Sequence, residues 1–237
     1  VTLILTLFLT SALLTSCTLN KNKEKTEPTI LKQKITLITK DEITLTANHY
    51  PSNSDKGIIL LHMFKKDKDS WNNFPTILQN KGYNVFTLNL RGHGESDLDI
   101  NTFTPQDFQD MVKDVDSALD YLITKEIFQI SIIGASMGAN TAINYAAEEP
   151  RIQKTILISP ALNYKGITTQ KSIQKYTRPL LIITGEQDSS SKESSETLFN
   201  SSPSKKELKL YETSDHGTDL LNNNPLSKEF IIQWLKE

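Results

Sequence analysis

Short, continuous apolar runs alternate along most of the chain with segments of helical periodicity. A run such as GIILLHM at 57–63 contains almost no polar residues. This is typical of a strand in a parallel sheet whose two faces are both covered. Two β-branched segments joined by a polar turn come first, and they predict an antiparallel hairpin. The predicted strands are 33–38, 43–48, 57–63, 83–90, 128–134, 153–159, 179–185 and 207–213, and the predicted helices are 70–80, 105–125, 137–149, 190–200 and 225–236.

This alternation predicts an α/β fold with a mainly parallel, doubly wound sheet of about eight strands and helices on both faces. Pro75 is expected to bend or divide the helix 70–80. Residues 160–178 are too few for a large lid domain, although one short helix would fit there. Because sites in such sheets form at the carboxyl ends of the strands, the residues that directly follow the apolar runs are the functional candidates.

Composition restricts the class of protein. The chain has 237 residues, of which 37% are hydrophobic, so residues 31–237 are enough for one domain with a sizeable core. The formal net charge of -2 and the absence of a long basic segment argue against nucleic acid as a partner. No cluster of Cys and His residues has metal-ligand spacing, so neither a metal nor an organic cofactor is predicted.

The first 16 residues carry no charge and are mostly apolar. At about 1.5 Å per residue, a helix of this length is short for a hydrocarbon core of about 30 Å. Residues 1–16 are therefore predicted to be a signal peptide, and the polar, charge-mixed residues 17–30 a flexible tether.

Cys17 is the only cysteine, so an intramolecular disulfide is impossible. The segment Leu14-Thr15-Ser16-Cys17 resembles a bacterial lipoprotein signal, in which cleavage precedes a cysteine that becomes lipidated. The resemblance implies an exported protein that is anchored to a cell-envelope membrane through Cys17. An ordinary signal peptide with an incidental cysteine, and hence a secreted or periplasmic protein, is the alternative.

The stretch GASMG at 134–138 follows a predicted strand and opens a predicted helix. In this context G-x-S-x-G places the serine on a sharp turn above the sheet, and glycines permit the close packing that the turn needs. Ser136 is therefore the candidate nucleophile. The alternative is a glycine-rich structural turn without chemistry.

A serine nucleophile needs a base, and the base needs an orienting carboxylate. His216 follows the last predicted strand, and Asp188 follows the strand before it, which gives the order Ser, Asp, His along the chain. Glu186 competes for the carboxylate role, and Asp188 has the alternative role of a helix N-cap. Asp215 is less favoured because a sequence neighbour is poorly placed to bond the adjacent imidazole.

Five landmarks together make the chain resemble the α/β-hydrolase family over residues 31–237. They are LLHMF at 60–64, RGHGES at 91–96, GASMG at 134–138, TGEQD at 184–188 and DHG at 215–217. The resemblance implies Ser136 as nucleophile, Asp188 as acid and His216 as base.

The same resemblance implies an oxyanion hole made by the backbone N–H of Met137 and one from the loop after the third strand. Phe64 is the first choice there and Met63 the second. Family members commonly have His-Gly where this chain has His62-Met63, so the donor from this loop is open. His62 and His93 are expected to bond loop backbones, and Arg91 is expected to hold its loop.

The activity implied is the hydrolysis of carboxylic esters through an acyl-enzyme, as in a carboxylesterase or a lysophospholipase-like enzyme, without a cofactor. The substrate would be a small-molecule or lipid ester. Phe64, Trp71, Phe103 and Tyr164 are candidates to line an apolar cleft, although a position in the core or on the surface is favoured for each. A thioesterase, peptidase or perhydrolase on the same fold is an alternative, and so is a hydrolase-like binding lipoprotein without catalysis.

Overall fold

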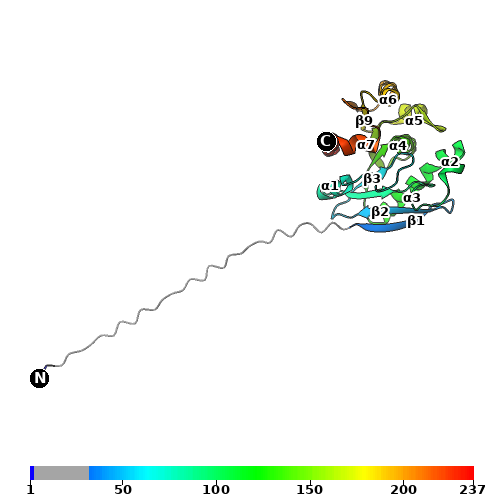
Figure 1. The fold of residues 1–237 in the computed structure, drawn as a ribbon. Helices are drawn as coiled ribbons and strands as arrows, with labels where there is room; N and C mark the ends of the chain where they lie inside the picture. The colour runs from blue at the N-terminus through cyan, green and yellow to red at the C-terminus, as the bar shows by residue number, and fades with distance from the viewer. Residues whose placement is uncertain (3–31) are drawn as a thin grey trace.

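A computed structural model of the chain describes residues 1–2 and 32–237. Figure 1 shows one domain in which the strands form a central sheet and the helices cover it. The predicted lipidation at Cys17, the tether and all but the first two residues of the predicted signal peptide lie outside the described residues.

The central sheet has eight strands in the order β1-β2-β4-β3-β5-β6-β9-β10. β1 pairs antiparallel with β2, β2 pairs antiparallel with β4, and every other pair is parallel. The predicted hairpin and the mainly parallel sheet are confirmed. The strands are β1 (Gln33–Ile38), β2 (Thr44–Tyr50), β3 (Lys56–Leu61), β4 (Asn84–Leu88), β5 (Gln129–Ala135), β6 (Ile152–Ile158), β9 (Leu180–Gly185) and β10 (Lys206–Tyr211).

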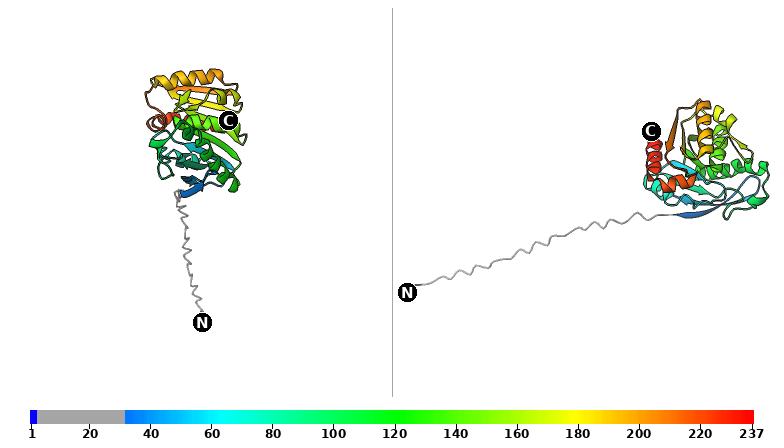
Figure 2. Two further views of the ribbon diagram at one scale, coloured as in Figure 1. Left: turned by 90° about the vertical axis from the view of Figure 1, so that its right-hand side faces the viewer. Right: turned by 45° about the horizontal axis from the view of Figure 1, so that its top comes forward.

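Helices cover both faces of the sheet, as the alternating pattern predicts (Figure 2). Successive strand residues point to opposite faces, so Ile59 packs in one core and Ile58 in the other. Helices α3, α4, α5 and α6 contribute to the first core, and α1, α7 and α8 to the second. The helices are α1 (Phe74–Asn80), α2 (Pro105–Gln109), α3 (Met111–Thr124), α4 (Met137–Glu148), α5 (Gln170–Lys175), α6 (Ser189–Ser201), α7 (Thr218–Asn223) and α8 (Pro225–Lys236), with a 3-10 turn η1 (Ile100–Thr102).

Three helical segments differ from the sequence prediction. The predicted helix 70–80 begins only at Phe74, because Pro75 then occupies the first turn, where its missing N–H costs nothing. The predicted helix 105–125 is two helices separated at Asp110, whose ψ of -9° departs from the α-helical value of about -42°. The short helix α7 was not expected from the sequence.

The connection at 160–178 contains no large lid, in agreement with the prediction. It folds into a small hairpin of β7 (Asn163–Tyr164) and β8 (Ile167–Thr168), followed by α5. The buried amide of Asn140 on α4 holds this connection from both sides. Its Nδ2 donates to the carbonyl of Ile167 at 2.9 Å, and its Oδ1 accepts from the N–H of Ala161 at 3.0 Å.

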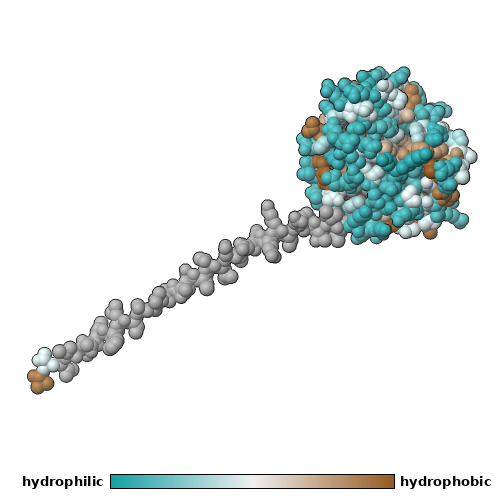
Figure 3. All heavy atoms as spheres, viewed as in Figure 1, coloured by the Kyte–Doolittle hydropathy of each residue, from teal (hydrophilic) through white to brown (hydrophobic). Residues whose placement is uncertain are grey.

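The viewed face of the domain is predominantly hydrophilic, with hydrophobic residues in small groups (Figure 3). The large apolar side chains that are exposed in the domain, such as Ile38 and Phe128, come from different parts of the chain. Within residues 1–2 and 32–237, no helix has the length and hydrophobicity that crossing a bilayer requires.

Candidate active site

Ser136 lies on a sharp turn between β5 and α4. Its backbone has φ of 52° and ψ of -115°, a region that L-residues rarely occupy. The conformation is held because the N–H of Ser136 donates to the carbonyl of Ile158 at 2.8 Å, while its own carbonyl accepts from the N–H groups of Ala139 and Asn140. The turn thus raises the serine hydroxyl above the carboxyl end of the sheet.

Two glycines make this turn possible. A Cβ on Gly134 would lie 2.1 Å from the carbonyl oxygen of Gly138, inside the first turn of α4. A Cβ on Gly138 would lie 2.3 Å from the carbonyl oxygen of Leu61 at the end of β3. Backbone atoms cannot move aside as a flexible side chain can, so helix, nucleophile strand and β3 meet this closely only with glycine at both positions.

Ser136, His216 and Asp188 form one hydrogen-bonded chain. The Nε2 atom of His216 lies 2.7 Å from the Oγ of Ser136, and its Nδ1 lies 2.6 Å from the Oδ2 of Asp188. The three side chains come from the loops after β5, β10 and β9. The structure therefore brings together the three side chains for which the sequence predicted nucleophile, base and acid.

The two competing carboxylates are placed elsewhere. Glu186 is exposed at the end of β9. The Oδ2 of Asp215 accepts a hydrogen bond of 3.1 Å from the side-chain amide of Asn223 on α7. Only Asp188 among the three candidates bonds the imidazole of His216.

Two serines that sequence reasoning missed support His216. The Oγ of Ser191, buried in the first turn of α6, lies 3.2 Å from the same Nδ1 that faces Asp188. The Oγ of Ser159 accepts a hydrogen bond of 3.0 Å from the N–H of Gly217. Ser159 directly follows β6, so its position at the carboxyl end of a strand was a usable signal, whereas Ser191 lies within a helix and offered none.

The loop after β3 runs beside the start of α4. The backbone N–H groups of Met63, Phe64 and Met137 find no acceptor within the part of the chain that the structure describes. Met63 has an ordinary negative φ, and the left-handed residue of this loop is Lys65 instead, with φ of 58°. The absence of the common glycine after His62 therefore imposes no backbone strain at Met63.

His62 is a structural residue of this loop. The N–H of Leu90 donates to its Nε2 at 3.1 Å, so the proton of the neutral ring sits on Nδ1, which donates to the carbonyl of Met63 at 2.9 Å. Complete burial, followed by the nearby His93 ring, lowers the pKa of His62 to about 3. The Nδ1 of His93 contacts the carbonyl of Arg91 at 3.0 Å. The expectation that both histidines bond loop backbones is confirmed.

Arg91 holds its loop through two carboxylates. Its Nε lies 2.8 Å from Asp114 on α3, and its two terminal nitrogens lie 2.9 and 3.1 Å from Asp41 in the turn between β1 and β2. The hydrogen bonds from Arg91 hold the pKa of Asp41 well below its usual range. Arg91 is buried and already paired, so it is a structural residue, as the sequence indicates.

The four aromatic residues proposed for an apolar cleft separate into two groups. Trp71 is only 1% exposed and packs against Phe74, so it is a core residue, which is one of the two alternatives favoured from the sequence. The ring centroid of Phe64 lies 5.8 Å from Tyr164, and Phe103 packs beside Phe108 on the same side of the sheet.

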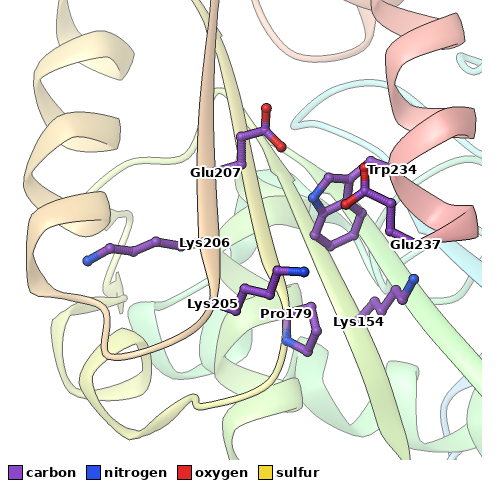
Figure 4. Close-up of a pocket in the computed structure, with 7 residues that line it drawn as sticks. All are labelled: Lys154, Pro179, Lys205, Lys206, Glu207, Trp234 and Glu237. Atoms are coloured by element: carbon purple, nitrogen blue, oxygen red, sulfur yellow. The ribbon is translucent and has the colours of Figure 1, made fainter.

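A separate pocket lies where β6, β9 and β10 begin, at the opposite end of the strands from Ser136 (Figure 4). It is lined by Lys154, Pro179, Lys205, Lys206, Glu207, Trp234 and Glu237. The Nζ of Lys154 is already bonded to the carbonyl of Leu235 at 2.9 Å, and Lys206 reaches away from the pocket to the carbonyl of Ser202.

Within residues 1–2 and 32–237, no group of three or more His, Cys, Asp or Glu side chains is arranged to hold a metal ion.

Comparison with known sequences gives partial matches. Residues 52–169, about half of the chain, match the family described as serine aminopeptidase, S33. Two curated bacterial relatives, provisionally named a non-heme chloroperoxidase (Synechocystis sp.) and an esterase/lipase 2 (Mycoplasma genitalium), are each 28% identical over 129 and 122 residues. These alignments cover 53% and 51% of this chain but only 44% and 43% of the relatives, so the chain matches less than half of their length.

Comparison with solved structures covers most of the chain. An esterase from Pyrococcus furiosus aligns with a TM-score of 0.73 and 21% identity over 87% of this chain and 92% of that one. Est1E from Butyrivibrio proteoclasticus, solved with ferulic acid bound, aligns with a TM-score of 0.71 and 20% identity over 86% of this chain and 100% of that one. At about 20% sequence identity, these alignments show that the folds are alike. With its eight-stranded sheet, its serine turn and these neighbours, the chain has the α/β-hydrolase fold.

Proposed function

We propose that this protein is a serine hydrolase that cleaves carboxylic esters through an acyl-enzyme. The observation that carries the proposal is the continuous hydrogen-bonded chain from the Oγ of Ser136 through the imidazole of His216 to the carboxylate of Asp188, with distances of 2.7 and 2.6 Å. A hydroxyl without a neighbouring base is a weak nucleophile, so this contact gives Ser136 its reactivity.

In the first half of the reaction the Oγ of Ser136 attacks the ester carbonyl, and its proton passes to the Nε2 of His216. The carboxylate of Asp188 stabilises the imidazolium that forms. When the tetrahedral intermediate collapses, the bond to the alcohol breaks and His216 returns the proton to the departing alkoxide. Water then attacks the acyl-enzyme with the same base, which releases the acid and restores Ser136.

The oxyanion of the tetrahedral intermediate needs two hydrogen-bond donors. The N–H of Met137 at the start of α4 is one, and the N–H of Phe64 is the first choice for the other, with Met63 second. All three N–H groups lack an acceptor within residues 32–237, and the 12-residue helix α4 adds the positive end of its dipole. Donors that are already oriented toward the developing charge make a large electrostatic contribution.

Labelling by a fluorophosphonate probe tests this proposal. The full chain should be labelled, the Ser136→Ala variant should not, and the His216→Ala variant should be labelled far more slowly. An ester panel graded by acyl length, with a thioester and an aminoacyl amide beside it, then separates an esterase from a thioesterase or a peptidase. A folded wild-type protein that takes no label would refute the proposal and favour a non-catalytic binding protein.

A lipid anchor is the second part of the proposal. Cys17 follows an apolar residue and two small ones, in the place where a bacterial lipoprotein signal needs it, and it is the only cysteine of the chain. An anchored hydrolase would act on esters that are present at a cell-envelope membrane. The test is mass spectrometry of the protein expressed in a bacterial host with its own leader. An acylated N-terminal cysteine supports the anchor, and an unmodified Cys17 overturns it.

A further inference from the structure

Two lysines from distant parts of the chain meet over one aromatic ring next to the candidate active site. The Nζ of Lys165 lies 4.9 Å from the ring centroid of Phe64 and 5.5 Å from that of Phe108. The Nζ of Lys65 lies 5.6 Å from the same Phe64 centroid. Lys165 is at the tip of the β7–β8 hairpin, and Lys65 is in the loop that supplies the proposed oxyanion donor.

Neither of these two amines has an anionic partner. In the part of the chain that the structure describes, Lys65 and Lys165 form no ion pair and no side-chain hydrogen bond. The other lysines of the same loop differ, since Lys66 faces the carboxylate of Asp219 at 3.9 Å and Lys68 bonds Glu95 at 3.0 Å. The positive charge over Phe64 is therefore uncompensated, while the charges next to it in sequence are balanced.

The backbone positions of both lysines are well defined. Lys65 and Lys165 have φ values of 58° and 48°, so each sits at a left-handed turn position. The hairpin tip is held because the side chain of Asn163 accepts from the N–H of Gly166 at 3.0 Å, and the side chain of Gln109 on α2 donates to the carbonyl of Gly166 at 3.1 Å. Both side chains thus start from turn positions, and the turn that carries Lys165 is bonded to α2.

The Phe64 ring that both amines approach belongs to a group of aromatic side chains. The Phe64 ring contacts Tyr164 at a centroid distance of 5.8 Å and Phe108 at 6.2 Å. A cation over an aromatic face leaves most of its hydrogen-bonding capacity free, so each ammonium can still bond an anionic oxygen. An apolar or aromatic spacer on this surface would carry a terminal anionic group to the amines.

We propose that Lys65 and Lys165 bind a negatively charged group of the substrate, so that the preferred substrates are esters in which an apolar or aromatic spacer separates a carboxylate or similar anion from the scissile carbonyl. This inference rests on the proposed esterase function of Ser136, which it extends to a substrate class. Phe64 is the contact surface for the spacer, and the two ammonium groups recognise the anion.

Matched pairs of esters that differ in charge and not in shape test the proposal. One pair is 4-acetoxybenzoate and 4-acetoxybenzamide, which carry the charge in the alcohol part. The other is monomethyl adipate and methyl adipamate, which carry it in the acyl part. In at least one pair, kcat/KM of the wild-type full chain should favour the anionic ester, and added salt should reduce this preference.

Variants assign the preference to the two lysines. Lys65→Gln and Lys165→Gln should each reduce the ratio of kcat/KM for the anionic ester to kcat/KM for the neutral ester about fivefold. The double variant should reduce this ratio about tenfold or more. Lys125→Gln is the matched control, because this lysine also lies over a ring, 5.4 Å from the centroid of Tyr121, but far from Ser136. Its ratio should not change.

A binding measurement separates this inference from the proposed function. In the Ser136→Ala variant, calorimetry should detect tighter binding of 4-acetamidobenzoate or of adipamate than of the corresponding neutral diamides, and the Lys65→Gln/Lys165→Gln changes should abolish the difference. Equal kcat/KM within both ester pairs together with equal binding would overturn the lysine proposal. So would a charge preference that survives the double substitution. Failure of hydrolysis alone would count against the esterase function and leave the binding result to decide.

Discussion

The hydroxyl of Ser159 accepts a hydrogen bond of 3.0 Å from the backbone N–H of Gly217, 58 residues further along the chain. Ser159 directly follows β6 and has a left-handed conformation with φ of 50°, and Gly217 directly follows His216. The loop that carries the proposed base is therefore fastened to a central strand and not only to β10, from which it emerges.

Replacement of Ser159 by alanine should loosen this loop. The buried N–H of Gly217 would lose its acceptor, which costs about 1–3 kcal/mol in the free energy of unfolding. We expect kcat to fall with little change in KM, because the imidazole is less well oriented. Urea unfolding and ester kinetics measure the two effects, with Ser131→Ala on β5 as the control. Wild-type kcat in a Ser159→Ala protein would contradict the positioning role.

Asp188→Asn removes the negative charge of the side chain and keeps its shape, so it tests whether the charge is needed. An amide cannot stabilise the imidazolium and favours the wrong tautomer of His216, so kcat should fall by about 10³- to 10⁴-fold. The folded structure should be retained, as circular dichroism would report. Asp215→Asn is the matched control because Asp215 bonds Asn223 and not the imidazole, and it should remain active. Equal losses in the two variants would argue against Asp188 as the orienting acid.

Gly138→Ala should disrupt the nucleophile turn. Its Cβ would lie 2.3 Å from the carbonyl oxygen of Leu61, so either α4 or β3 must shift, at a cost of about 1–3 kcal/mol. Fluorophosphonate labelling should be lost in protein that is still folded. Gly82→Ala is the control, because its Cβ would meet open space and only its φ of 89° is unfavourable. Labelling of the Gly138 variant at the wild-type rate would be inconsistent with the tight turn.

The contribution of His62 to stability should fall as the medium is acidified below pH 6.5. Burial lowers the pKa of His62 to about 3, whereas the same group in the unfolded chain titrates near 6.5. Between these values the unfolded state binds a proton that the folded state does not, so the free energy of unfolding falls by up to about 1.4 kcal/mol per pH unit. Burial also lowers the pKa of His93 and of His49, which act in the same direction.

Urea unfolding of wild type and His62→Gln between pH 7 and pH 4 measures this dependence. The variant should be less stable at pH 7, because its side chain cannot reproduce both hydrogen bonds of the ring, but its stability should depend less steeply on pH. The remaining slope belongs to the other titrating groups. Identical slopes in the two proteins would mean that His62 titrates alike in the folded and unfolded states.

Arg91→Lys should be strongly destabilising even though the charge is kept. A single ammonium cannot replace the forked bonds to Asp41 and Asp114, and the carboxylate of Asp114 is fully buried. We expect a loss of about 2–4 kcal/mol in the free energy of unfolding. Arg151→Lys, an exposed residue paired with Glu149, should cost less than about 1 kcal/mol. Equal small costs at both positions would contradict the structural role of Arg91.

Much of the fold, and the three side chains Ser136, Asp188 and His216, were predictable from local patterns. Buried parallel strands are apolar on both faces, so β3, β5 and β9 appear as continuous runs, and the order of Ser136, Asp188 and His216 follows from residues at the ends of such runs. Helix boundaries were less predictable. Pro75 occupies a first turn and not an interior, and the break at Asp110 leaves the apolar spacing of Phe108 and Met111 almost unchanged.

Contacts between distant segments could not be read from any one segment. The partnership of Ser159 with Gly217 depends on β6 lying beside β9 and on the loop after β10 folding back across them. The same holds for the position of Lys65 and Lys165 over the one ring of Phe64. Such features depend on strand order, which periodicity does not encode.

The position of β10 at the edge of the sheet has a consequence for inactivation. β10 pairs on one side only, with β9, and most of its side chains are half-buried or exposed, so it is more easily released than the central strands, which pair on both sides. Its release would carry His216 away from Ser136 while the central strands remained paired. Mild heat or denaturant should therefore abolish the reactivity of Ser136 under conditions that leave most of the secondary structure intact. Labelling by a fluorophosphonate should be lost at a lower temperature or denaturant concentration than the circular dichroism signal.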